Sequence, residues 1–145
     1  YFRLLAADAR VEPLPEAIVV HPVRAAPWGI SLAQQKKVLF DALLFKKHRA
    51  AYRERIRRAP RWDYYAIVGA LGTAAQGALL DAGSVAAGGA ALWGVLTGRF
   101  CLARLKPARK CASHVAEIVL TSVLIPPLAV FWRAVGALRF RVVFL

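Results

Sequence analysis

Two short groups of polar residues have types and positions that could do chemistry. His21 ends a run of β-branched residues and precedes Pro22, so it would emerge from a strand end, where ligands and catalytic groups often lie. The second group is Gln34, Gln35, Lys36 and Lys37. It follows a predicted helix start, where amide and ammonium groups could bind a phosphate. Each group also has a simpler interpretation: a structural or exposed histidine, and the solvated face of a surface helix.

Three further positions are open to the same two kinds of interpretation. Asp81 could be a functional carboxylate inside a membrane, although at a hairpin tip with glycines on both sides it is more simply an exposed turn residue. His114 and Glu117 lie three residues apart at the start of the last apolar run, where they could pair with basic neighbours or face an acceptor. We interpret Cys101 and Cys111 as two free thiols, because their number and spacing fit neither a disulfide framework nor a metal site.

Motifs that would carry catalysis are missing from these 145 residues. The sequence has no glycine-rich phosphate loop, no Ser/His/Asp set, no paired carboxylates and no Cys/His metal spacing. We therefore predict no catalytic residue within this chain.

The composition indicates a membrane-associated protein. Hydrophobic residues make up 59% of the sequence and charged residues 20%, which is too apolar for an ordinary soluble domain of this length. The 21 Lys and Arg residues outnumber the 8 Asp and Glu residues, giving a net charge of +13. These charges form blocks that alternate with uncharged stretches, a pattern that argues against both disorder and a nucleic-acid-binding domain.

Residues 1–27 look like the end of a soluble domain. They read as the last turns of a helix, then two short strands at 9–14 and 16–21 that Pro13 and Pro15 separate, and then an extended linker. Charged residues interrupt any signal-peptide pattern. Because the sequence contains no Met, even at position 1, we expect the chain to be a piece of a longer protein.

Residues 28–62 are predicted to form a basic interfacial helical region. Ser31 is a plausible N-cap for a helix that runs to about His48, and a second helical stretch ends before Pro60. The stretch from Lys36 to Arg61 contains ten basic residues and only two acidic ones. Since each basic residue near an anionic lipid surface contributes about 1 kcal/mol, membrane lipid is the expected partner.

Residues 63–145 are predicted to form the membrane region. Asp81 divides positions 64–98 into two uncharged runs, which predicts a transmembrane helical hairpin with Asp81 at its tip. Basic blocks flank both outer ends of the hairpin, so the positive-inside rule places both flanks in the cytoplasm. The third apolar segment, 118–132, contains Pro126 and Pro127 and could cross, kink or re-enter. The tail 140–145 alternates like a strand or an extended arm.

A family resemblance rests on the first 22 residues. Arg3-Leu4, Pro15-Glu16-Ala17 and the Val-Val-His sequence ending at His21 match the spacing R-L-x-x-x-G-x-x-x-x-x-x-P-E-A-x-V-x-H, with Asp8 at the glycine position. This string resembles the closing segment of the catalytic domain in family-2 inverting glycosyltransferases. The residues that follow look like the juxtamembrane region of membrane-bound bacterial members. Gln34 to Val38 is distantly similar to the Gln-x-x-Arg-Trp motif of processive relatives, with Lys37 and Val38 replacing Arg and Trp.

The resemblance implies a GT-A type enzyme that transfers a sugar from a nucleotide-sugar donor, with a divalent cation (Mg or Mn) on the diphosphate. The cation ligands and the catalytic acid of the family would precede Tyr1. His21 would approach the metal or the diphosphate, and residues 34–37 would lie near the diphosphate or the acceptor.

Together these observations predict a mainly α membrane protein: a short β-strand remnant of a GT-A domain, an interfacial helix, a transmembrane helical hairpin and a third hydrophobic segment. It would be the membrane-anchoring part of a glycosyltransferase of the bacterial inner membrane, with its N-terminal and basic segments cytoplasmic and a membrane-associated, lipid-linked or polysaccharide acceptor. The alternative is a small non-enzymatic membrane adaptor or subunit that binds anionic lipid or an acidic partner.

Overall fold

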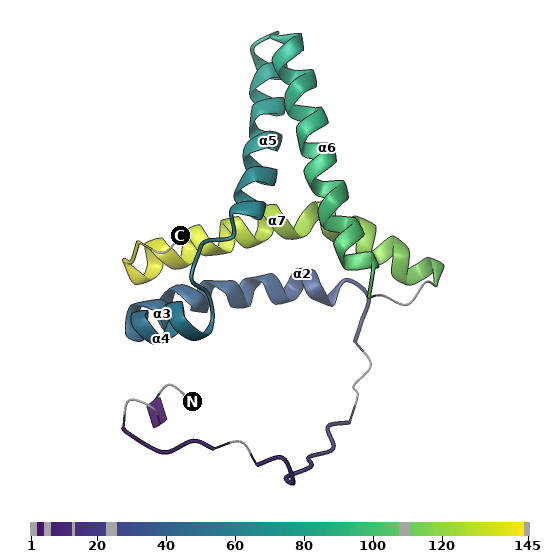
Figure 1. Cartoon of the computed structure of the whole chain (residues 1–145). Helices are drawn as coiled ribbons and strands as arrows, with labels where there is room; N and C mark the ends of the chain where they lie inside the picture. The colour runs from purple at the N-terminus through teal and green to yellow at the C-terminus, as the bar shows by residue number, and fades with distance from the viewer. Residues whose placement is uncertain (1–2, 5–6, 13, 23–25, 108–110, 144–145) are drawn as a thin grey trace.

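The computed structural model of this chain is mainly helical (Figure 1). It describes residues 3–4, 7–12, 14–22, 26–107 and 111–143. The elements in chain order are α2 (Ile30–Gln34), the 3₁₀ helix η1 (Gln35–Val38), α3 (Leu39–Lys47), α4 (Arg49–Arg55), α5 (Trp62–Leu79), α6 (Gly83–Leu105) and α7 (Ala112–Phe140).

Helices α5 and α6 form the predicted hairpin. They pack side by side and stand away from the rest of the molecule (Figure 1). Two glycines allow this close contact: a Cβ atom at Gly77 would collide with the backbone of Ala86, and one at Gly89 would lie 2.5 Å from the backbone nitrogen of Ala74. Asp81 occupies the tip with a φ of 55°, which confirms its interpretation as a turn residue.

Below the hairpin, α2, η1, α3 and α4 combine with α7 into what we call the basal layer, residues 30–55 and 112–140. Helix α7 runs across the foot of the hairpin, and the continuous stretch from α2 to α3 lies along it (Figure 1). The core of the layer contains Ala42, Phe45 and Tyr52, with the Phe45 and Tyr52 rings edge to face at 5.6 Å.

Helix α7 continues through Pro126 and Pro127 for 29 residues, so the third apolar segment is one long helix. Its buried side repeats at helical spacing, with Ile118, Thr121, Ser122, Ile125, Pro126, Ala129, Arg133 and Gly136. Close approach to α3 again needs a glycine, because a Cβ at Gly136 would lie 2.6 Å from the carbonyl oxygen of Leu39.

Two helices, α6 and α7, are long and apolar enough to cross a membrane by length and composition. This finding comes from the part of the chain that the structure describes, and it supports membrane association. Helix α5 is not one of the two, since Asp63, Gln76 and its tyrosines lower its hydropathy.

Three expectations about local structure are wrong. The β-strand remnant is not formed: the described residues between 9 and 22 are coil or turn and fully exposed at positions such as Ile18 and Val20, because no neighbouring strand supplies hydrogen bonds. Ser31 is not the N-cap, since the helix begins at Ile30 after Gly29. The tail differs at its start, because helix α7 reaches Phe140 and a left-handed Arg141 ends it, whereas residues 144–145 lie outside the described residues.

Candidate functional site

The basal layer is the candidate functional site, because it brings cationic, polar and apolar side chains from distant segments together. An ion pair between a buried arginine and a half-buried aspartate lies at its centre. Arg133 of α7 is 5% exposed and its Nη2 lies 3.6 Å from Oδ2 of Asp41 on α3. A charge buried this deeply needs a partner, so this pair holds α7 to α3 in a defined register.

Burial and neighbouring charges shift the pKa values of two groups at this centre. Burial raises the pKa of the Asp41 carboxyl above its ordinary value, while the charges of Arg133 and Arg57 oppose that rise. Burial, followed by the charge of Asp41, raises the pKa of the Tyr52 hydroxyl, which stays neutral at physiological pH. The centre of the layer therefore combines two guanidinium groups, a carboxyl group and a phenol in partly desolvated surroundings.

A second polar contact joins the other end of α7 to the start of α2. The backbone N–H of Gly29 donates to Oε1 of Glu117 at 2.7 Å, and Nδ1 of His114 lies 3.5 Å from Oε2 of the same carboxylate. Gly29 has a φ of 74°, a conformation that glycine adopts without strain. His114 and Glu117 thus pair within the fold, and their position fixes where the N-terminal segment leaves the layer.

A third contact joins α6 to α7 at the foot of the hairpin. Nη1 of Arg104 donates to Oγ1 of Thr121 at 2.9 Å and to Oγ of Ser122 at 2.8 Å, and it also lies 3.3 Å from the carbonyl oxygen of Ile118. Beside it, the Tyr64 ring packs edge to face on Phe100. Aromatic and cationic groups therefore lie together at the hairpin base, an arrangement that is common at membrane interfaces.

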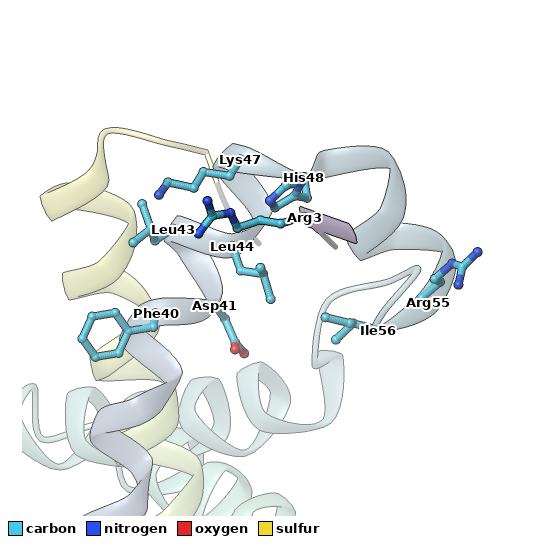
Figure 2. Close-up of a pocket in the computed structure, with 9 residues that line it drawn as sticks. All are labelled: Arg3, Phe40, Asp41, Leu43, Leu44, Lys47, His48, Arg55 and Ile56. Atoms are coloured by element: carbon cyan, nitrogen blue, oxygen red, sulfur yellow. The ribbon is translucent and has the colours of Figure 1, made fainter. Parts of the chain in front are cut away.

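An open cavity of about 760 Å³ lies beside α3 and α4 (Figure 2). Its lining residues are Arg3, Phe40, Asp41, Leu43, Leu44, Lys47, His48, Arg55 and Ile56. Arg3, Lys47 and His48 gather at one side of the cavity, whereas the Arg55 guanidinium points away from them (Figure 2). A cationic rim over an apolar wall suits a ligand that has an anionic head and an apolar continuation.

The structure places the sequence-predicted residues in two separate regions. Gln34, Gln35, Lys36 and Lys37 lie in consecutive turns of α2 and η1. Nε2 of Gln35 donates back to the carbonyl oxygen of Ser31, and the Lys36 ammonium lies 5.8 Å from the centre of the Trp132 ring. Lys36 thus helps to hold η1 against α7. His21 lies outside the layer, exposed in the irregular N-terminal segment.

A cation site would need several ligands close together. The described residues include no group of three or more His, Cys, Asp or Glu side chains that could hold a metal ion. His21 is exposed, and it belongs to no such group among them.

Sequence reasoning missed Arg133, Asp41 and the cavity. A single arginine between apolar residues on a long helix is a signal that could have pointed to a buried pair, because a charge in such a place needs a counter-ion. The cavity gave no signal, since Arg3 lies about forty residues before the other lining residues.

No protein-family model, curated protein or solved structure matches this chain. The sequence pattern of residues 1–22 and the geometry of the basal layer are therefore the two features that bear on its function.

Proposed function

We propose that this chain is the C-terminal, membrane-anchoring part of a GT-A type glycosyltransferase. The enzyme would transfer a sugar from a nucleotide-sugar donor to a membrane-associated or polysaccharide acceptor at the cytoplasmic face of the bacterial inner membrane. The observation that carries the proposal is the order of the parts. The segment that resembles the end of a catalytic domain joins, at Gly29, a cationic layer from which an apolar hairpin rises.

In this proposal, the chain positions the reaction and does not catalyse it. The catalytic acid and the ligands of a Mg or Mn ion belong to a domain that precedes residue 1, with His21 at its edge. The ion would supply charge for the leaving diphosphate. The basal layer holds that domain against the leaflet, where a membrane-bound acceptor is concentrated in two dimensions.

The cavity beside α3 and α4 suits a lipid-linked acceptor. Arg3, Lys47 and His48 can donate hydrogen bonds to a phosphate, and Leu43, Leu44 and Ile56 can pack against the first carbons of its lipid chain. Because Arg3 comes from the segment that resembles the catalytic domain, the cavity would lie where that domain meets the membrane anchor.

The experiment that tests this proposal is a transfer assay on the intact gene product in membranes, with a panel of nucleotide sugars. We expect His21→Ala to lower sugar transfer at least tenfold without releasing the protein from membranes, because an imidazole beside the diphosphate would be lost. The matched control is Arg10→Gln, an exposed residue of the same segment that pairs only with Glu12 among the described residues. Unchanged transfer by His21→Ala would return that residue to a structural role.

A non-enzymatic membrane adaptor is the second candidate. The cationic layer favours it independently of any sugar chemistry, since such a layer binds anionic lipid or an acidic partner on its own. The two candidates separate in the same assay. Transfer of a sugar from any donor supports the enzyme, whereas binding to anionic vesicles without transfer from the whole panel supports the adaptor.

A further inference from the structure

Helix α7 is long and apolar enough to span a membrane. Polar contacts nevertheless join it, from near its start to its end, to residues 29–47, which belong to the basic region 28–62. Near its start, Glu117 accepts a hydrogen bond from Gly29, immediately before α2. Near its end, the Lys46 ammonium donates to the carbonyl oxygen of Phe140 at 2.8 Å. The α2–α3 stretch and α7 therefore run side by side and in the same direction.

Further contacts between these two ends keep α7 aligned with the α2–α3 stretch. Lys36 lies over the Trp132 ring, Arg133 pairs with Asp41, and Gly136 packs on the backbone of Leu39. Any position that α7 takes in a membrane is consequently shared by residues 30–47.

Because the two segments move together, their charged residues indicate whether α7 crosses the bilayer or lies on its surface. If α7 crossed, the α2–α3 stretch would cross with it and carry Lys36, Lys37, Asp41, Lys46 and Lys47 through the hydrocarbon. Charges within a bilayer core are strongly unfavourable, and only the Asp41 charge has a buried counter-ion here. Cationic residues on a helix that lies in the interface instead meet anionic headgroups.

The orientation of α7 relative to the hairpin also favours a helix that lies on the bilayer. Helix α6 is the other helix long and apolar enough to cross, and its buried residues are Gly89 and Thr97. Because α7 runs across the foot of the α5–α6 hairpin, a bilayer that the hairpin crosses contains α7 in its plane (Figure 1).

We infer that α7 lies flat in the interface of the leaflet that the hairpin enters, and that its partner is the lipid of that leaflet. The apolar residues that α7 leaves exposed form the surface for this contact: Val119, Leu120, Leu124, Phe131 and Leu138. Helix α6 also leaves apolar residues exposed, including Leu92, Val95 and Leu102. Both ends of α7 then lie on one side of the membrane. This inference holds for either candidate function, because it does not depend on sugar transfer.

Cysteine labelling of the full chain in native membranes tests the inference. In a Cys101→Ser, Cys111→Ser background, single cysteines replace exposed residues: Ser113→Cys and Arg139→Cys at the two ends of α7, Arg58→Cys in the basic segment and Ser84→Cys at the hairpin tip. A membrane-impermeant maleimide is applied to intact cells and to inverted vesicles. We expect positions 113, 139 and 58 to react from one side and position 84 from the other. Reaction of positions 113 and 139 from opposite sides would overturn the inference.

A depth measurement keeps the inference testable if a labelled end is shielded by lipid. Nitroxide labels at Leu120, Leu124, Phe131 and Leu138 are compared for collision with oxygen and with a water-soluble nickel complex, in vesicles of phosphatidylethanolamine and phosphatidylglycerol. A helix in the interface gives one shallow depth at all four positions. A spanning helix gives a depth that is greatest near 124–131 and falls toward both ends, which would contradict our inference.

Discussion

The two apolar parts of this chain, the α5–α6 hairpin and α7, are held by different kinds of interaction. The two helices of the hairpin approach each other closely at Gly77 and Gly89, and many of its exposed side chains are apolar. Helix α7 is apolar too, but an ion pair and several hydrogen bonds join it to residues 29–47. Hydropathy alone groups α6 and α7 together as candidate membrane spans. Their polar contacts differ, because α6 has such contacts with α7 at its foot, through Arg104, whereas α7 has them near both ends.

The largest expected effect comes from breaking the buried pair. Asp41→Ala leaves the Arg133 guanidinium 5% exposed and without its carboxylate partner. We expect the free energy of unfolding to fall by about 3 kcal/mol, at the lower end of the range for such losses because the Asp41 side chain is 38% exposed. Thermal unfolding in detergent micelles measures this loss. A double variant, Asp41→Leu with Arg133→Met, should recover most of it, and failure to recover would assign the loss to packing and not to charge.

A smaller effect is expected in the hairpin, where two adjacent glycines provide a matched pair. Gly89→Ala places a methyl group against the backbone of Ala74, which should cost about 2 kcal/mol through separation of the two helices. Gly88→Ala meets nothing within 4 Å and should be neutral or stabilise the helix by up to about 1 kcal/mol. Unfolding midpoints of the two variants test the difference. Equal midpoints would mean that the glycine contact does not hold the hairpin together.

The smallest expected effect is the pH dependence that comes from Asp41, on the α7 side of the comparison. Burial raises the folded-state pKa of Asp41 above its unfolded value of 3.8. Between these two pKa values the folded protein therefore binds more protons than the unfolded chain. The stability contribution of this group is therefore present at low pH and is lost as pH rises through the folded-state pKa. Because Asp41 is partly exposed, the change should be less than about 1 kcal/mol. Asp41→Asn should remove this part of the pH slope of the unfolding free energy, and an unaltered slope would place its origin elsewhere.

Those parts of the fold that depend on local pattern could be predicted from the sequence. The uncharged runs around Asp81 predicted the helical hairpin and its tip. The pattern after Ser31 predicted a helix to about His48, and the helical stretch ends at Lys47. In each case the deciding residues are neighbours in sequence, so periodicity and charge spacing are sufficient.

The features that sequence reasoning missed depend on partners that are distant in sequence. Asp41 and Arg133 lie 92 positions apart, and Gly29 and Glu117 lie 88 apart. No local pattern fixes which of several arginines meets which carboxylate. The strand expectation at 16–21 failed for the opposite reason, because a β-branched run forms a strand only beside another strand, and the described residues supply none. The placement of His21 beside a metal stays a prediction.

The hydrogen bond between Gly29 and Glu117 also limits the reach of whatever precedes it. Eight peptide units separate His21 from this anchored glycine. A fully stretched chain covers at most about 3.6 Å per residue, so His21 can lie no more than about 29 Å from that attachment point. If the basal layer lies at the membrane surface, as we propose, any chemistry at His21 takes place within this radius of the layer.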